Sequence, residues 1–154
     1  MISIKNFDLS RYLGTWYEIS RLPNWFEKNL TDVTATYSLK PNGKLCVQNE
    51  GTNLVRGKRS VVVGKAKFAG KPNEGYLKVS FFGPFYADYI ILEIDPEYQW
   101  AMVAGSKKYL WILSRTPSMD TALMEYLRDK AKALGFDVGE LRMTPQNSQR
   151  KLPE

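Results

Sequence analysis

The chain has 154 residues, a formal net charge of +6 and no histidine. A chain of this length is expected to form a single domain, 1–154, whose core needs no disulfide or metal for stability. Without histidine it has neither His-based acid–base or nucleophilic chemistry nor His metal ligands. Its single cysteine, Cys46, excludes an internal disulfide, and the dispersed basic residues are typical of a solvated basic surface.

No apolar run approaches the length of a transmembrane helix. The first residues, Met1–Asn6, have no apolar h-region and no cleavage signature. We therefore expect no signal peptide in this chain, although a mature protein would look the same.

Short β-type runs recur at intervals of about ten residues, each bounded by turn residues, as in an antiparallel barrel or sandwich. The second run alternates apolar and polar residues, and Pro41-Asn42-Gly43 after it favours a tight hairpin. The sixth run is apolar on both faces, which predicts that something covers its outside. A loop is expected at 51–57. The runs are 14–22, 33–39, 44–50, 58–68, 76–81, 86–94, 99–104 and 109–115.

The hydrophobic period changes after residue 117 and becomes helical. One face of the predicted helix, 119–134, carries Met119, Leu123, Leu127, Ala131 and Leu134. Ser118 is the expected N-cap, and Gly135 ends the helix with Phe136 packed back on the last turn. We expect the helix to pack outside the strands. A short extended segment at 140–144 and a polar tail at 145–154 follow.

Gly14-x-Trp16 opens the first run, and Arg115 closes the last. In a closed barrel the first and last strands are neighbours, so the guanidinium can lie on the indole face. We therefore predict an all-β fold, an eight-stranded antiparallel up-and-down barrel over about 12–117 with one plugged end. Glu18 shares the parity of Trp16 and is expected to form a buried pair or face water. No second carboxylate is identifiable beside it for acid–base work.

Alternation along the strands predicts which side chains face the interior. Together with Tyr89, these form the predicted ligand-binding set: Ala35, Tyr37, Val47, Val62, Ala66, Phe68, Leu77, Val79, Phe81, Trp111 and Leu113. Gly64 and Ala66 are small and can leave space opposite large aromatics. For any single member of the set, plain core filling is the alternative interpretation.

In an up-and-down order the connections alternate between the two ends of the barrel. If Trp16 lies at the plugged end, the connections after the first, third, fifth and seventh strands form the mouth. They carry the apolar Trp25, Phe26, Leu54, Val55, Phe82 and Phe85 and the cations Lys28, Arg56, Lys58, Lys107 and Lys108. This combination suits a ligand with an apolar tail inside and an anionic head at the mouth. The alternative is that the aromatics only pack the loops down.

These residues resemble the lipocalin family. Gly14-x-Trp16 matches the family's first signature, and Arg115 matches the third. Ala87-Asp88-Tyr89 looks like the second, Thr-Asp-Tyr, with Ala87 in place of Thr. The three in order, followed by an amphipathic helix, are specific, whereas one Gly-x-Trp is not. The segments 12–19, 33–39, 77–86 and 109–117 resemble bacterial members grouped with apolipoprotein D, and the similarity spans about 7–144.

The resemblance implies a non-catalytic, cofactor-free barrel that binds a fatty acid or lysophospholipid, for storage or transport in membrane lipid maintenance. Bacterial members are typically outer-membrane lipoproteins facing the periplasm, and a close relative dimerises. The resemblance therefore implies an outer-membrane or periplasmic location, contact with a membrane surface and a homodimer as expectations. No cysteine precedes Cys46 to carry a lipid anchor. Either the signal and anchor were removed, or this member is soluble, with a cytoplasmic location as the alternative.

Three other functions compete with lipid binding. A carrier of haem, bilin or pigment stays open, although haem would need Tyr, Met or Cys46 as its axial ligand. A lipocalin-fold enzyme is disfavoured because no triad, metal cluster or paired carboxylates can be identified. Nucleic-acid binding is disfavoured because no aromatic-and-basic motif follows one strand.

Overall fold

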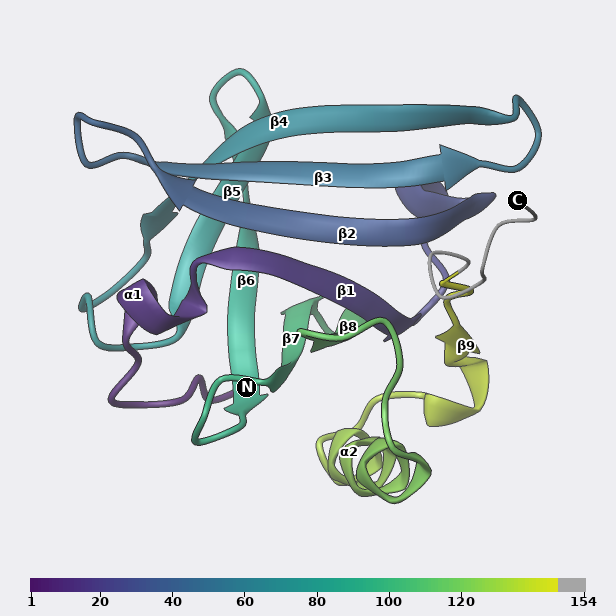
Figure 1. Cartoon of the computed structure of the whole chain (residues 1–154). Helices are drawn as coiled ribbons and strands as arrows, with labels where there is room; N and C mark the ends of the chain where they lie inside the picture. The colour runs from purple at the N-terminus through teal and green to yellow at the C-terminus, as the bar shows by residue number, and fades with distance from the viewer. Residues whose placement is uncertain (147–154) are drawn as a thin grey trace.

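The computed structural model describes residues 1–146 and contains one antiparallel sheet that closes on itself (Figure 1). The strand order is β2-β3-β4-β5-β6-β7-β8-β1-β9, and an additional β2–β1 pairing closes the barrel. The predicted eight-stranded barrel is confirmed. Its strands are β1 (Gly14–Arg21), β2 (Leu30–Leu39), β3 (Leu45–Asn53), β4 (Lys58–Phe68), β5 (Tyr76–Phe82), β6 (Phe85–Ile94), β7 (Trp100–Ser106) and β8 (Tyr109–Ser114), and β9 (Arg142–Met143) is the additional strand.

Strand β1 is shared by three neighbours. Its first half, 14–17, pairs with β2, and its second half, 17–21, pairs with β8 on the other edge. Where β1 and β2 diverge, β9 takes the free edge of β1 through Ser20 and Arg21. The segment after β9 then bridges both strands, because Thr144 N–H donates to Ile19 O and Asp32 N–H donates to Pro145 O, each at 2.9 Å.

The predicted loop 51–57 is half wrong, because β3 continues to Asn53. Gly51, Thr52 and Asn53 read as turn formers, but β4 pairs with all three of them. On the other edge, β2 pairs with Thr52 and Asn53. Pairing on two sides therefore outweighs the local preference, and the true connection is 54–57.

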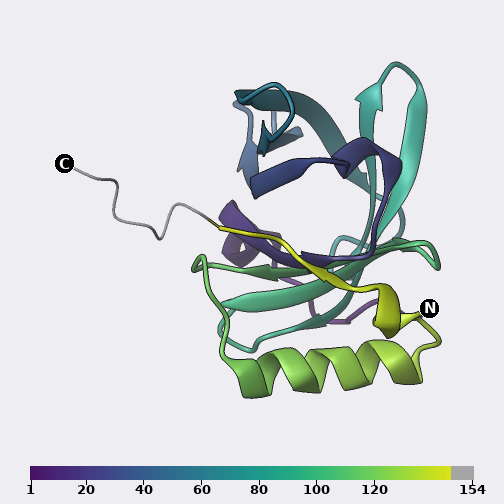
Figure 2. The same cartoon turned by 90° about the vertical axis from the view of Figure 1, so that its right-hand side faces the viewer.

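The helix α2 (Thr121–Ala133) packs on the outside of β7 and β8, as expected, and lies along the bottom of Figure 2. Its buried Leu127 and Ala131 contribute to an outer core. The strands contribute Met102, Ala104, Leu110 and Ile112, and Leu92 of β6 packs against the same core. The outer face of β6 was expected to be covered, and α2 covers part of it.

The C-terminal end of α2 was predicted correctly, but its N-cap residue was not. The N-cap is Asp120, not Ser118, because Asp120 Oδ2 accepts from Leu123 N–H at 3.2 Å. At the other end Gly135 has φ +93°, and Phe136 N–H donates to Ala131 O at 3.1 Å. This is the predicted Schellman ending.

The plugged end is closed by a short helix, α1 (Leu9–Tyr12), at the left of Figure 1. Trp16 is fully buried beneath it and donates its indole N–H to Tyr12 O at 2.8 Å. The Arg115 guanidinium lies 3.8 Å from the centre of the Trp16 ring and also donates to the carbonyls of Arg11, Thr15 and Tyr98. The predicted stack is present, and it fixes α1 to the barrel.

Candidate ligand-binding site

The interior of the barrel is apolar and is lined by alternate residues of the strands. Every member of the predicted ligand-binding set except Val62 lies in or against the interior core cluster: Ala35, Tyr37, Val47, Ala66, Phe68, Leu77, Val79, Phe81, Tyr89, Trp111 and Leu113. The period-2 pattern found them because each strand keeps one face inward through most of its length.

Several of these inward-facing side chains keep a partial solvent exposure. They are Ala35, Ala66, Phe68, Val79, Phe81, Tyr89 and Trp111, whereas Tyr37, Val47, Leu77 and Leu113 are buried. Side chains that face inward and are still reached by solvent border space that protein atoms do not fill. A barrel that encloses a ligand requires such exposure.

Val62 shares the parity of Ala66 but is 42% exposed and lies outside the interior cluster, so its contact with a ligand stays a prediction. Strand β4 pairs with β5 only over 65–68, so 58–64 has a strand neighbour, β3, on one side. At the point of divergence Gly64 lies tight against β5: an added Cβ would come 2.5 Å from Ser80 O. Alternation alone does not show where two strands separate.

Three tyrosine hydroxyls meet inside the barrel next to Trp16. Tyr37 donates to the Tyr89 hydroxyl at 2.8 Å, and the Tyr12 and Tyr89 hydroxyls are 2.5 Å apart. Burial raises the pKa of Tyr37 to about 12 and raises the pKa values of Tyr12 and Tyr89 well above their ordinary value. The plugged end of the interior is thus lined by neutral hydroxyls.

Asp88, the remaining predicted signature residue, is partly exposed on β6. It accepts from Tyr76 and from Lys78 Nζ, each at 2.9 Å. The hydrogen bond from Lys78 holds the pKa of Asp88 below its ordinary value. These bonds connect β5 to β6, so Asp88 has a structural role in the barrel wall.

The mouth has an apolar rim, defined here as Trp25, Phe26, Leu54, Val55, Phe82 and Phe85. All six are exposed: Trp25 at 79%, Val55 and Phe85 at 77%, Phe82 at 73%, Leu54 at 63% and Phe26 at 45%. The rim cations Lys28, Arg56, Lys58, Lys107 and Lys108 are exposed as well. The ring of Phe26 packs against Trp25, Tyr109 and Trp111, with ring centroids 5.6, 5.5 and 6.3 Å apart, so loop packing accounts for this ring. The other five rim side chains are 63–79% exposed.

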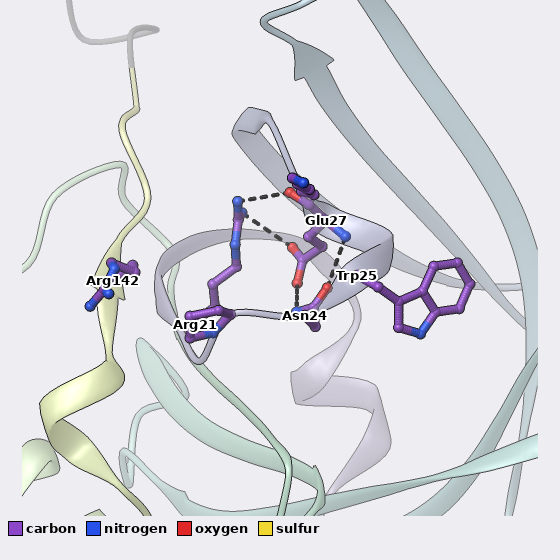
Figure 3. A pocket seen from close by; sticks show the side chains of 7 residues that line it. Arg21, Asn24, Trp25, Glu27 and Arg142 are labelled. Atoms are coloured by element: carbon purple, nitrogen blue, oxygen red, sulfur yellow. Dashed lines mark hydrogen bonds and ion pairs between the residues drawn. The ribbon is translucent and has the colours of Figure 1, made fainter.

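The first connection of the mouth carries a short 3₁₀ helix, η1 (Trp25–Glu27), and is held by a buried carboxylate. Glu27 Oε1 accepts from the Trp111 indole at 2.7 Å and from the Asn24 amide at 2.8 Å. Figure 3 shows Glu27 turned toward Arg21 and Trp25 pointing away from them. One end of η1 is therefore bonded to an interior residue while the other presents an aromatic ring to solvent.

Arg21 joins two carboxylates at the base of this connection. Its Nη1 lies 2.8 Å from Glu18 Oε2 and 3.5 Å from Glu27 Oε2, and its Nη2 donates to the carbonyls of Glu27 and Leu30. Glu18 therefore forms a buried pair, as expected. The expectation that no second carboxylate lies beside it was wrong, because η1 folds Glu27 back over nine positions of sequence.

Burial raises the pKa of Glu18 well above its ordinary value, and the neighbouring Glu27 adds to that effect. Arg21 and the hydroxyl of Thr144, which donates to Glu18 Oε2, oppose it. Gln146 adds hydrogen bonds from its side-chain amide to Glu18 O and Val33 O, at 2.8 and 3.0 Å. The first residues of the predicted polar tail thus belong to the barrel, while 147–154 lie outside the described residues.

Two surface depressions border the mouth on its outer side. The first, about 510 Å³, is lined by Arg21, Pro23, Asn24, Trp25, Glu27, Lys28 and Arg142. The second, about 310 Å³, is lined by Leu22, Pro23, Lys107, Lys108, Asp137 and Glu140. They meet at Pro23, which places the η1 connection beside the β7–β8 connection. Neither is part of the interior.

Within residues 1–146, no group of His, Cys, Asp and Glu side chains is arranged to hold a metal ion. In the same range, no helix is long and apolar enough to cross a membrane.

An up-and-down eight-stranded barrel with one end closed by a short helix and an apolar interior defines a class, the small closed barrels whose interior is wide enough for side chains or one small ligand. The chain matches the lipocalin-like domain family over residues 7–146. It therefore belongs to the lipocalin family.

Its relatives agree with this assignment. The chain is 49% identical to outer membrane lipoprotein Blc of Escherichia coli K12 over 138 residues, covering 89% of this chain and 78% of the relative. It is 41% identical to temperature-induced lipocalin-1 of Arabidopsis thaliana (94% and 82% covered) and 34% identical to apolipoprotein D of Mus musculus (92% and 78%). Insecticyanin from the tobacco hornworm Manduca sexta has the same fold, with a TM-score of 0.76 at 21% identity over 94% of this chain and 84% of that one.

Proposed function

We propose that the protein binds a monoacyl lipid, a fatty acid or a lysophospholipid, and stores or carries it without catalysis. The observation that carries the proposal is the set of inward-facing apolar side chains that remain partly exposed, with Phe81, Val79 and Trp111 among them. An acyl chain removes that surface from water, which is the main source of affinity for an apolar ligand.

The rim cations support an anionic or zwitterionic head at the mouth. Lys28, Lys107 and Lys108 are exposed there, whereas the plugged end offers the neutral hydroxyls of Tyr12, Tyr37 and Tyr89. A charged head left at the mouth keeps its hydration, while its burial at the plugged end would be costly. The relatives named outer membrane lipoprotein make a location at the bacterial cell envelope part of this proposal.

The proposal is tested with Ala66→Phe, which places a ring among the inward-facing side chains of β4. The matched control is Val63→Phe on the same strand, where the side chain has the opposite parity and is 55% exposed. We expect Ala66→Phe to weaken binding of oleate and of lysophosphatidylcholine about tenfold or more, because the ring fills ligand space. The control should bind like the parent protein in both tryptophan-quench titration and native mass spectrometry.

Two outcomes would contradict the proposal. The parent protein could bind neither lipid below about 100 μM, an affinity of only about −5.5 kcal/mol. Alternatively, both variants could lose binding equally, which would locate the lipid outside the barrel. A coloured protein as purified would instead favour a haem, bilin or pigment ligand.

A further inference from the structure

Most of the large exposed apolar side chains at the ends of the barrel strands lie at the mouth. Trp25, Phe26, Leu54 and Val55 belong to its connections, and Phe82 and Phe85 are the strand residues on either side of its 83–84 turn. At the opposite end the connections 40–44, 69–75 and 95–99 carry none of the exposed large apolar side chains of the described residues, and Leu39, which ends β2 there, is 48% exposed. Exposed apolar side chains are therefore concentrated at the mouth.

Charge is distributed with the same asymmetry. The mouth connections and the first residue of β4 contain the rim cations, and the one carboxylate of these connections, Glu27, is buried against Arg21 and Trp111. The exposed Asp137 and Glu140 lie beside Lys107 and Lys108, so at that side of the mouth carboxylates accompany the cations. The connections of the opposite end contain Glu74, Asp95 and Glu97 beside their lysines. The mouth is therefore a cationic surface with aromatic side chains at its edge.

We infer that the mouth docks on an anionic phospholipid surface, with the apolar rim inserted at the level of the headgroups and the rim cations on the lipid phosphates. Tryptophan and phenylalanine beside lysine and arginine are the side chains that favour the boundary between headgroups and acyl chains. Cations near an anionic leaflet add attraction that falls off within a Debye length. The side chains come from separate connections around one opening, so a planar surface can meet them together.

A second copy of the chain fits this surface less well. In a two-fold symmetric contact the same patch faces itself. The rim cations of one copy would then face a patch that carries the same cations, and like charges across an interface are unfavourable. Charge complementarity favours the lipid surface.

The advantage of the docked orientation for lipid transfer rests on the proposed function. If the interior holds an acyl chain, a mouth applied to the bilayer lets that chain pass between membrane and barrel with little exposure to water. Surface binding itself requires no ligand and can be measured separately.

The test compares two charge-reversal variants of equal net charge. Lys28→Glu with Arg56→Glu changes the mouth, and Lys44→Glu with Lys71→Glu changes the plugged end; each lowers the net charge from +6 to +2, because every reversal subtracts 2. Binding is measured by flotation with phosphatidylcholine vesicles that contain or lack phosphatidylglycerol. We expect the mouth variant to lose about tenfold or more in affinity for anionic vesicles and the matched variant to lose much less.

Insertion of the rim is tested with Phe82→Ser and Phe85→Ser together, and with vesicles containing brominated lipid. The double variant should bind anionic vesicles more weakly although its net charge is unchanged. Brominated lipid should quench the tryptophan emission of the parent protein, and it should quench the emission of Trp25→Phe less. Equal loss of vesicle binding in both charge variants would overturn the inference. So would a dimer in analytical ultracentrifugation that the rim variants abolish, because a second copy would then cover the mouth.

Ala66→Phe separates this inference from the proposed function. It should float with anionic vesicles like the parent protein even though it has lost lipid binding in the interior. Loss of monoacyl binding in the parent protein with vesicle binding intact would contradict the proposed function alone.

Discussion

Trp16 and Arg115 form a stack that belongs to the plugged end and not to the ligand site. The indole is fully buried, and the guanidinium above it is hydrogen-bonded to three backbone carbonyls. The arginine thus holds α1, β1 and the β6–β7 connection together. Both residues were identified from sequence because a first and a last strand must meet in a closed barrel.

Replacement of Trp16 by alanine should destabilise the fold and leave ligand preference unchanged. We expect a loss of about 3–5 kcal/mol in the free energy of unfolding, typical of a buried aromatic residue, measured by urea denaturation. Trp25→Ala, at a site that is 79% exposed, serves as the control and should change stability by less than about 0.5 kcal/mol. A stable Trp16→Ala protein that no longer binds ligand would mean that the two ends of the barrel are assigned the wrong way round.

Glu18 gives the stability a pH dependence whose sign follows from its raised pKa. The folded state holds the Glu18 proton more tightly than the unfolded chain does, so the contribution is complete below the ordinary pKa of about 4.3 and is lost as pH rises through the folded-state value. Glu18→Gln keeps an oxygen that can accept from Thr144 and removes the titration. We therefore expect the variant to gain stability relative to the parent as pH rises from 5 to 8.

Urea denaturation at pH 5 and pH 8 measures this difference. Glu125→Gln, on the exposed side of α2, is the matched control and should show no such trend. If the difference between Glu18→Gln and the parent were the same at both pH values, burial of Glu18 would not be coupled to its protonation.

At the scale of single strands, the separation of β4 from β5 shapes the wall of the mouth. Strand β4 pairs with β3 from Lys58 to Ala66 but with β5 only from Lys65 to Phe68. Gly64 stands at the branching point, where a side chain would overlap Ser80 O and the Phe81 ring. The glycine is needed there for close approach rather than for an unusual φ.

Gly64→Ala should therefore weaken the β4–β5 contact. We expect a loss of about 1–3 kcal/mol in the free energy of unfolding, as for other overpacked sites, together with faster amide exchange in 65–68. Gly70→Ala is the control, because an added Cβ there meets Glu74 Oε2 at 3.3 Å, the end of a flexible side chain. Equal effects of the two substitutions would show that backbone entropy, and not contact with β5, limits residue 64.

Most elements could be predicted from sequence because their patterns are local. The hairpin after Leu39, the alternation in β5 and the glycine at the end of α2 each act over a few residues. The contacts that could not be predicted join distant parts of the chain: Glu27 with Trp111, Thr144 with Glu18, and the point where β4 leaves β5. The hydrophobic periodicity of a sequence does not show which polar side chains come into contact when a connection folds back.

At the scale of the whole molecule, the segment 142–146 completes the barrel where β1 and β2 diverge. Truncation after Leu141 should remove the β9 pairing and the hydrogen bonds of Thr144 and Gln146 to β1 and β2. At about 0.5–1.5 kcal/mol for each net hydrogen bond, we expect a loss on the order of 2–4 kcal/mol in urea denaturation. Truncation after Gln146 keeps every one of these contacts and is the control against which the loss is measured. A full-stability protein ending at Leu141 would contradict the role given to this segment.

The shared strand β1 also sets the order in which the chain can fold. Its hairpin partner β2 follows within a few residues, but its other partners lie far along the chain: Thr144 is 126 positions from Glu18, and Gln146 is 128 positions away. Closure of so long a loop costs entropy before any contact compensates it, and topologies dominated by such pairings fold slowly. During synthesis the second half of β1 therefore leaves the ribosome early and stays unpaired until β8 and then residues 142–146 emerge. For that interval an open strand edge is exposed, and the nascent chain is most in need of protection from aggregation.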